Sequence, residues 1–245
     1  MNKPVKKYRL IHLTRRWHRY LGLILGIQFI LWTLGGLYFS WTNIDEIRGD
    51  NLKNRNPSLV FDQGFVSPST FLNHHLKATD SLISLEVVSI LKKPFYLLVY
   101  TTKGSEKVKL INAVTGRTRL PLNKDDAIRI AQEKLNVDAT VDNVEIITET
   151  NGHHEYRERP LPAFAITFSA PAKTTVYVSQ DYGNVQTFRN NKWRVFDFLW
   201  MMHTMDYKER DNLNNWLLRA FSIFGLVTIL SGFTLYFLTS KKRFR

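Results

Sequence analysis

Two long apolar stretches, Tyr20–Trp41 and Trp216–Leu238, bracket this chain, and neither contains an acidic residue. At about 1.5 Å of rise per helical residue, each stretch is long enough to cross the ~30 Å hydrocarbon layer of a bilayer. The sequence therefore predicts two transmembrane helices at residues 20–41 and 216–238, with a polar domain of about 170 residues between them.

The basic residues are concentrated in the two tails. Seven Lys or Arg residues lie within residues 1–19 and four within 239–245, and neither tail contains an acid. Of the 34 basic residues, 23 therefore remain to face the 21 acids elsewhere in the chain. Because basic tails resist translocation, we expect both termini in the cytoplasm and the central domain outside it. The nearly neutral middle argues against nucleic-acid binding.

The first span is interpreted as an uncleaved anchor. Its apolar run is about twice the length of the apolar core of a signal peptide, and Tyr38–Trp41 offers no pair of small residues for cleavage. The chain contains no cysteine. This fits an exported domain without disulfides, and it excludes c-type haem attachment and thiolate metal sites.

The central domain, expected at residues 42–190, contains two similar halves at about 60–119 and 120–190. Each half is predicted to contain a helix, three strands and a glycine turn, with Asn123 capping the second helix. The expected helices are Ser67–Lys77 and Asp125–Leu135, and the expected strands are Leu82–Ile90, Phe95–Thr101, Lys107–Ala113, Val141–Ile147, Ala163–Phe168 and Thr174–Ser179. We therefore predict an α+β fold in which each half packs one helix on an antiparallel sheet.

This order of segments resembles the PepSY domain, flanked by spans that resemble the PepSY-associated transmembrane family. The residues that carry the resemblance are Trp17–Leu23, Asp126–Ala131, Val176–Val185, Met202–Thr204 and Leu230–Tyr236. The resemblance covers nearly the whole chain and implies a bacterial cytoplasmic (inner) membrane protein with a periplasmic domain. It also implies iron or siderophore reduction, or transmembrane electron transfer, with b-type haem between helices. Larger members have about four spans, so this chain would need a second copy or a partner membrane protein.

Two histidines beside the membrane match the candidate haem positions of that family. His18 lies at the cytoplasmic end of the first span, and His203 lies in an expected interfacial helix and loop at residues 191–215 on the outer face. Imidazole is the common axial ligand of b-type haem. A separation of roughly 30 Å would prevent one haem from using both. The alternative is that His18 is an interfacial side chain and His203 bonds to a nearby loop.

Further polar and small residues are candidates for binding or packing. His153 and His154 are weak metal candidates in the loop Asn151–Pro162, for which a solvated surface loop is the alternative. Gln28 is expected to hydrogen-bond the other span. Small residues at spacings of four predict helix packing, either within the chain or between copies of a homodimer. These residues are Gly22, Gly26, Thr228 and Gly232.

Two functional hypotheses remain open. The first is a haem-dependent electron-transfer or siderophore-reduction component with His18 and His203 as ligands and a ferric siderophore as a candidate substrate. The second is a non-catalytic, membrane-anchored module that binds a peptide or protein at its sheet edges. No phosphate loop, nucleophile elbow or dinucleotide fingerprint favours a nucleotide-driven enzyme or a hydrolase.

Overall fold

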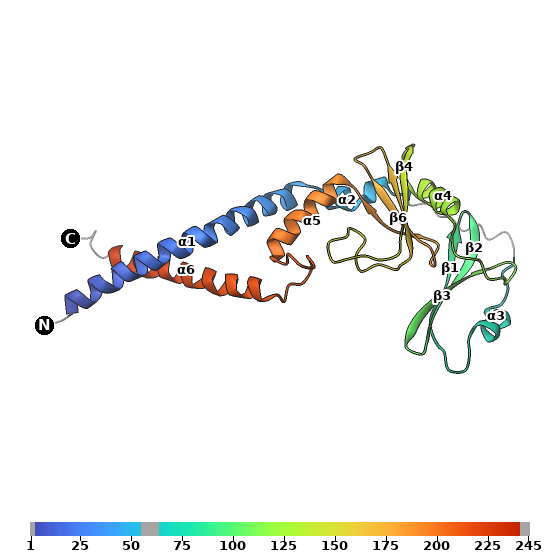
Figure 1. Cartoon of the computed structure of the whole chain (residues 1–245), viewed down its shortest axis with the longest axis horizontal. Coiled ribbons are helices and arrows are strands. Elements are labelled where there is room, and N and C mark those ends of the chain that lie inside the picture. The colour runs from blue at the N-terminus through green and yellow to red at the C-terminus, as the bar shows by residue number, and fades with distance from the viewer. Residues whose placement is uncertain (1–2, 55–63, 241–245) are drawn as a thin grey trace. The chain divides into compact units, whose positions relative to one another are not determined.

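The computed structural model describes residues 3–54 and 64–240. The chain forms two compact units (Figure 1), one made of Met1–Asn43 with Val195–Arg245 and the other of Ile44–Arg194. The first is helical and the second contains two antiparallel sheets with helices. The predicted α+β class, with an apolar helix near each end of the chain, is therefore confirmed.

Two long helices form the first unit. Helix α1 (Lys3–Trp41) has 39 residues and α6 (Trp216–Ser240) has 25. Both are long and apolar enough to cross a membrane. They pack antiparallel, with the ring centroids of Phe29 and Phe221 5.5 Å apart. The basic segment before the first span is not a separate tail, because from Lys3 onward it continues α1 without a break.

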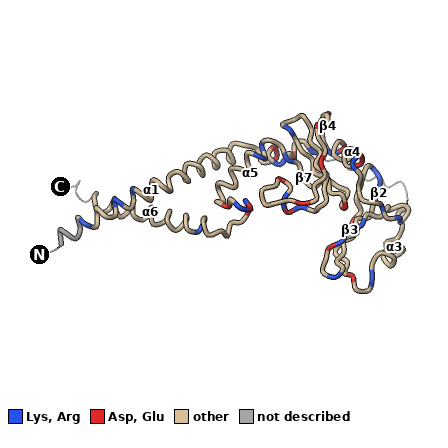
Figure 2. The backbone as a smooth tube through the Cα atoms, in the orientation of Figure 1, with Lys and Arg blue, Asp and Glu red and all other residues tan. Residues whose placement is uncertain are grey.

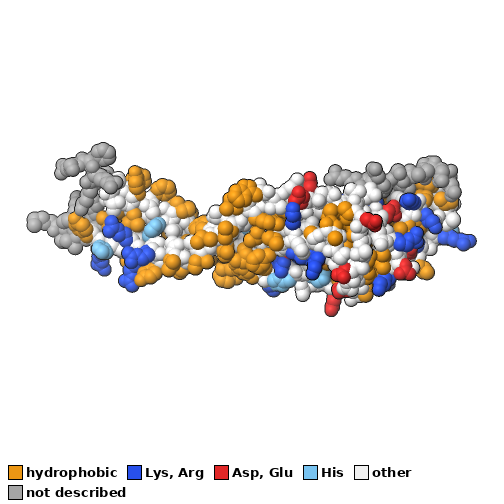
Figure 3. Space-filling model, turned by 90° about the horizontal axis from the view of Figure 1, so that it is seen from above, with side chains coloured by type: hydrophobic (Ala, Val, Ile, Leu, Met, Phe, Trp, Pro, Cys, Tyr) orange, Lys and Arg blue, Asp and Glu red, His pale blue; other side chains and the backbone are white. Residues whose placement is uncertain are grey.

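One narrow stripe of α1 is shielded from solvent. Its positions alternate between spacings of three and four residues, the pattern with which helices pack at small crossing angles. They are Ile11, Thr14, His18, Leu21, Leu25, Gln28, Trp32, Gly35 and Phe39. Much of the remaining surface of α1 and α6 is exposed and apolar, as one face shows in Figure 3. Helices that are apolar all round fit a lipid surrounding.

A third helix, α5 (Asn191–Thr204), lies against the C-terminal part of α1. The rings of Phe39 and Phe196 are 4.8 Å apart. A Cβ at Gly35 would lie 3.9 Å from the Cβ of Leu199. The stripe of α1 therefore contacts α6 over its N-terminal part and α5 over its C-terminal part.

The second unit begins with α2 (Ile44–Arg48) and a short 3₁₀ helix (Asp50–Leu52). Helix α3 (Pro68–His75) then precedes the strands β1 (Ser81–Ile90), β2 (Lys93–Thr102) and β3 (Ser105–Asn112). Helix α4 (Lys124–Lys134) precedes β4 (Val141–Ile147), β5 (Ala163–Phe168), β6 (Thr175–Ser179) and β7 (Val185–Arg189). Neighbouring strands follow chain order in both sheets.

The helices and strands predicted for this unit are confirmed to within two residues at each end. Asn123 caps α4 as expected, because its Oδ1 accepts a hydrogen bond from the backbone N of Asp126 at 2.8 Å. Helix α3 packs on the first sheet through Phe71, and α4 packs on the second through Ile130. Each half therefore has one helix on one face of an antiparallel sheet.

The two halves share their strand register. Tyr96 pairs with Ile111 in the first sheet as Phe164 pairs with Val178 in the second. In both halves this is the face that the preceding helix covers. The equivalence extends beyond the order of elements to individual positions, which is the pattern of an internal duplication.

The glycine turns of the two halves have the same geometry. Gly116 N donates to Asn112 O at 2.8 Å, and Gly183 N donates to Ser179 O at 3.0 Å. Both glycines have a φ of +68°. After the second turn the chain pairs again as β7, and after the first it forms a single bridge at Thr118.

The largest apolar core lies between α4 and both sheets. Phe164, Ile166 and Val178 of the second sheet meet Phe95 and Leu97 of the first in this core. The first sheet is thus covered on both faces, by α3 on one and by this core on the other. This explains why β2 is buried without interruption over residues 95–100, where every residue is aliphatic or aromatic.

Gly183 is a sensitive position in this core. A Cβ there would lie 2.7 Å from Cδ1 of both Ile90 and Leu110, two buried side chains. We expect Gly183→Ala to lower the free energy of unfolding by about 2–5 kcal/mol, because overpacking adds to the cost of a left-handed alanine. The measurement is denaturant unfolding of the full-length protein in detergent.

Gly104→Ala is the matched control. Gly104 has a φ of +77°, but a Cβ there would meet nothing within 4 Å. It should cost only about 1–2 kcal/mol. Equal losses for the two variants would contradict the close contact between the turn at Gly183 and the first sheet.

Candidate functional site

His18 lies on the stripe of α1 that packs on α6, with its Nδ1 2.7 Å from Oγ of Ser231. The Ser231 hydroxyl has one proton, which it donates to the carbonyl oxygen of Thr228 at 2.7 Å. It therefore accepts a hydrogen bond from His18, and we assign the imidazole proton to Nδ1 and the lone pair to Nε2. A ring held in this way presents Nε2 as a base or a metal ligand in a fixed orientation.

Gly232 provides the space for this imidazole. A Cβ at Gly232 would lie 3.3 Å from Cε1 of His18. Thr228 contributes its backbone carbonyl to Ser231, whereas its hydroxyl bonds within α6 to the carbonyl of Phe224 at 2.8 Å. Of these two candidates for helix packing in α6, Gly232 therefore lies against His18 of α1, whereas the Thr228 hydroxyl makes a hydrogen bond within α6.

Gly22 and Gly26 lie in a different environment. Among the described residues, no atom lies within 4 Å of a Cβ built at either residue. In the described part of the chain, this pair makes no close contact with another helix. Their surface on α1 is open to a second helix.

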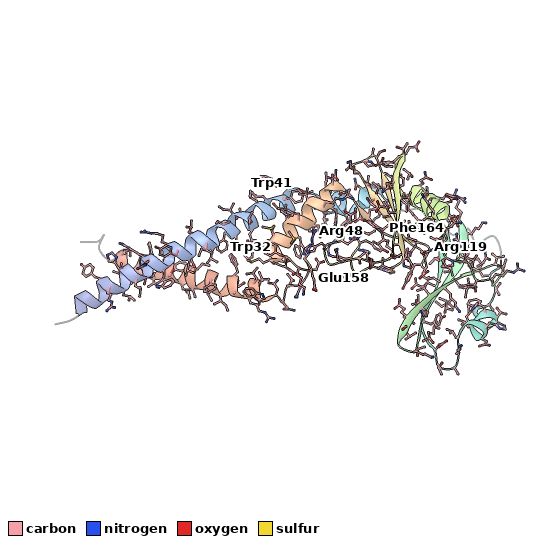
Figure 4. The ribbon with its side chains drawn as sticks, in the orientation of Figure 1. Trp32, Trp41, Arg48, Arg119, Glu158 and Phe164 are labelled. Carbon is pink, nitrogen blue, oxygen red and sulfur yellow. The ribbon has the colours of Figure 1, made fainter. Side chains whose placement is uncertain are left out.

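His203 lies in the last turn of α5 among aromatic rings. Its ring stacks on Trp32 with centroids 5.0 Å apart and on Trp200 at 6.2 Å, and it meets Phe39 edge-on at 6.2 Å. Figure 4 shows Trp32 on the side of α1 that faces α6. The site is therefore a packed aromatic cluster at the junction of three helices.

Two polar atoms in this cluster lack partners. Among the described residues, Nδ1 of His203 and Nε1 of Trp32 are buried and accept or donate no hydrogen bond. The expected bond from His203 to a nearby loop is therefore not made by Nδ1. An unpaired buried polar group costs about 1–3 kcal/mol, and such groups often mark a site that a bound molecule satisfies.

Gln28 hydrogen-bonds the last turn of α5. Its Nε2 donates to the carbonyl oxygen of Met202 at 2.7 Å, satisfying one of the carbonyls that a helix end leaves without a partner. This bond goes to α5, where the sequence led us to expect a bond to the second span. The chain then turns at Met205, which has a φ of +54° and packs on Leu25 and Phe221.

The two histidines are closer along the axis of α1 than expected. Because His203 stacks on Trp32, it lies at the level of a residue 14 positions beyond His18 on α1. At 1.5 Å per residue this is about 21 Å, compared with the roughly 30 Å expected. Axial ligands of one iron lie only about 4 Å apart, twice a metal–imidazole bond. One haem still cannot use both histidines.

The loop between α5 and α6 is ordered around Asp206, which is 5% exposed and not the solvated turn residue expected from its polar sequence context. This buried carboxylate accepts hydrogen bonds from the backbone N of Lys208, Glu209 and Asn212 at 2.9–3.2 Å. Burial alone would raise the pKa of Asp206, but these backbone donors outweigh burial and hold its pKa below the usual value. The loop therefore holds the end of α5, and with it His203, in place beside α6.

His153 and His154 lie in the segment between β4 and β5. His154 Nδ1 accepts a hydrogen bond from the backbone N of Tyr156 at 3.0 Å. Within the described part of the chain, no group of three or more potential ligands is arranged to hold a metal. His153 is exposed in this loop, whereas Tyr156 is fully buried and stacks on Tyr177 with ring centroids 4.7 Å apart.

Glu155 organises this segment, and no local pattern signalled it. Its two carboxylate oxygens accept from Nε and Nη2 of Arg194 at 2.7 and 2.9 Å, and Oε1 also accepts from the hydroxyl of Tyr177 at 2.8 Å. The guanidinium of Arg189 lies 3.9 Å from the ring centroid of Trp193. Bidentate pairs of this kind are strong and directional, so the cluster fixes the first turn of α5 on the second sheet.

No family model matches the chain, and no curated protein matches it. A functional proposal rests on the sequence pattern and on the geometry of the described residues.

The unpaired nitrogen of His203 generates a stability prediction. His203→Phe keeps a ring in the aromatic cluster and removes the buried polar atom, so we expect the free energy of unfolding to stay the same or rise by about 1 kcal/mol. Gln28→Leu should lower it by about 1–3 kcal/mol, because it leaves the carbonyl of Met202 without its donor. Thermal unfolding in detergent measures both. A large loss in His203→Phe would show that His203 has a structural polar role.

The buried tyrosines predict a loss of stability at alkaline pH. Burial raises the pKa of Tyr156 to about 12, and burial together with Glu155 raises the pKa of Tyr177. Tyrosine in an unfolded chain titrates near pH 10. The unfolded chain therefore releases these protons first, and the stabilisation, complete below about pH 10, declines as the pH rises toward 12. Unfolding midpoints across this range, with tyrosinate absorbance, test this; normal titration of all ten tyrosines in the folded protein would contradict it.

Proposed function

We propose that this chain is a PepSY-associated protein of the bacterial cytoplasmic membrane, with both termini in the cytoplasm and the Ile44–Arg194 unit in the periplasm. In this proposal it is a component of siderophore reduction or transmembrane electron transfer, with b-type haem at His18 and His203. The observation that carries the proposal is the orientation of His18 by Ser231.

The exposed surface of the helical unit supports a membrane setting. Side chains such as Leu23 and Phe237 are 70% and 65% exposed although they are fully apolar. Burying such surface stabilises by about 25 cal/mol per Å², and lipid provides the burial that the protein does not. Figure 2 shows Lys and Arg near the start of α1 and a long stretch without charge after them. This asymmetry supports a cytoplasmic N-terminus.

His18 fits the requirements of an axial ligand. Metal-binding histidines usually donate their second ring N–H to a fixed acceptor, which orients the ring and raises the basicity of the ligating nitrogen. Ser231 is such an acceptor for His18 Nδ1. Gly232 keeps the ring close to α6. Nε2 is thus the atom that would bind iron.

His203 fits through its unpaired nitrogen. Its buried Nδ1, next to the equally unpaired Nε1 of Trp32, is a polar atom in an aromatic setting that a bound group would satisfy. A haem at either position would carry one electron at a time. Its axial ligand and its burial among apolar side chains would together set its reduction potential.

A second copy of the chain would complete the coordination. About 21 Å of α1 separates the two histidines, so each iron needs its second ligand from elsewhere. The open surface at Gly22 and Gly26 lies one and two turns beyond His18 and lets another helix approach closely. A symmetric pair would bring like histidines of the two copies to the same depth.

Reduced-minus-oxidised spectra of protein purified from haem-replete cells test the proposal. We expect a b-type haem spectrum that is diminished in His18→Ala and in His203→Phe. Ser231→Ala should weaken haem retention by about 10–100-fold, the usual effect of removing the group that orients a metal ligand.

Ser222→Ala is the matched control. The Ser222 hydroxyl bonds to the carbonyl of Leu218 within α6 at 2.8 Å, nine residues before Ser231. Its haem content should equal that of the parent protein. A colourless parent protein, or equal spectra for the two serine variants, would remove the redox proposal.

A second candidate function is peptide or protein binding, which the sheet edges favour. Strands β1 and β4 lie at the ends of their sheets and pair with one neighbour each. Both carry exposed apolar side chains, Ile83 at 53% and Ile146 at 54%. An extended peptide adds to such an edge by backbone hydrogen bonds. This function predicts co-purification with a protein and no haem spectrum.

A further inference from the structure

A pocket of about 410 Å³ opens in the Ile44–Arg194 unit, beside the glycine turn of its first half. Three segments meet there: the hairpin between β1 and β2, the chain on both sides of the turn at Gly116, and the first turns of α4. Its charged lining residues are Lys93, Arg117, Arg119, Asp126 and Arg129. Neither the haem proposal nor the sheet edges involve it.

The pocket carries a net positive charge of three, from four bases and one acid. Asp126 Oδ2 binds Arg119 at 2.6 Å, and Asp126 Oδ1 lies 3.8 Å from Arg129. One carboxylate thus holds two guanidinium groups and neutralises only one of them. Lys93 and Arg117 add two further charges at the same opening. Such a concentration of like charge favours an anionic ligand.

Arg119 is held in place before any ligand arrives. Its guanidinium lies 5.4 Å from the ring centroid of Phe95 in a cation–π contact, and only 18% of its side chain is exposed. Figure 4 marks Arg119 in this unit. A pre-oriented guanidinium loses little entropy on binding and presents two parallel N–H donors to a carboxylate.

Apolar side chains form part of the pocket wall. Ile90, Leu91 and Phe95 are the apolar lining residues, and Phe95 is the one that contacts the guanidinium of Arg119. Inorganic phosphate would leave these apolar residues without a contact, whereas a carbon skeleton with several carboxylates would use both the charged and the apolar lining. The lining therefore favours a small organic polyanion.

The second half of the duplication shows that the charges are not required by the fold. Matching the two glycine turns places Arg117 at the position of Asn184 and Arg119 at that of Gln186. The strand register likewise places Lys93 at the position of Leu161. Three bases of the first half correspond to neutral residues in the second, so the same architecture forms without them.

We propose that this pocket binds a small di- or tricarboxylate anion, with its carboxylates on Lys93, Arg117 and Arg129 beside the fixed Arg119 and its carbon skeleton on Ile90 and Phe95. Binding at this position would join the turn of the first half to α4. This pocket shares no lining residue with the haem candidates, so the presence or absence of haem does not affect anion binding here.

Calorimetric titration of citrate into the full-length protein in detergent, at low ionic strength, tests the site. Arg117→Gln and Arg129→Gln should each weaken citrate binding by about tenfold, the loss of one charge-assisted contact. Lys107→Gln is the matched control, because it removes one positive charge from the neighbouring strand β3 outside the pocket. It should change affinity by less than about twofold.

Inorganic phosphate distinguishes a carboxylate site from general attraction of anions. We expect phosphate to bind at least about tenfold more weakly than citrate, because it leaves the apolar lining residues without a contact. Phosphate binding as tight as citrate binding, an equal effect of Lys107→Gln and Arg117→Gln, or no heat of citrate binding would each overturn the proposal. Circular dichroism of every variant confirms that a lost signal is not a lost fold.

Discussion

The helical unit depends on the packing of one stripe of α1 against α6 and α5. The stripe keeps its three-and-four spacing from Ile11 to Phe39, so α1 meets its neighbours along one line. Most positions on that line are apolar, and His18 and Gln28 are polar exceptions. Each of the two binds a specific partner, Ser231 or Met202, and so fixes the level at which the neighbouring helix lies. Polar groups at a packed seam specify register at some cost in stability.

The candidate haem site follows from this register. The contact of His18 with Ser231 holds α6 against α1, and in this arrangement the ring of Phe221 meets Trp32. The loop around Asp206 connects α5 to α6, and His203 at the end of α5 also stacks on Trp32. The two histidines thus differ in their hydrogen bonding. Ser231 fixes the proton of His18 on Nδ1, whereas the buried Nδ1 of His203 has no hydrogen-bond partner among the described residues.

The Ile44–Arg194 unit shows how a duplicated fold diverges. Both halves keep the features that the backbone requires, namely the helix on the equivalent face, the register and the glycine with a φ of +68°. The two halves differ in side chains that the shared backbone conformation does not require. Arg117 and Arg119 of the first half correspond to Asn184 and Gln186 of the second, so the shared backbone does not require these two guanidinium groups.

Local pattern was enough to predict α3, α4 and the strands β1 to β6 of this unit, whereas α2 and the 3₁₀ helix were not predicted. Alternating and continuous apolar runs mark strands, and the cap at Asn123 marks the start of α4, because each depends on residues close in the chain. The ion pair of Glu155 with Arg194 joins residues 39 positions apart and left no local signal. The same reason explains Gln28: the sequence shows a polar residue in a span, but its partner on α5 is known only once α5 has packed.

The sequence by itself determined the two apolar helices, the asymmetry of their charge, the order of the strands and the duplication. These features rest on composition and on periods of two or 3.6 residues, which backbone geometry imposes locally. Only the tertiary structure decided which nitrogen of His18 bears the proton, that His203 lies beside Trp32, and that four bases and Asp126 line one pocket. Each of these depends on side chains brought together by packing across long separations, and no short-range rule encodes such contacts.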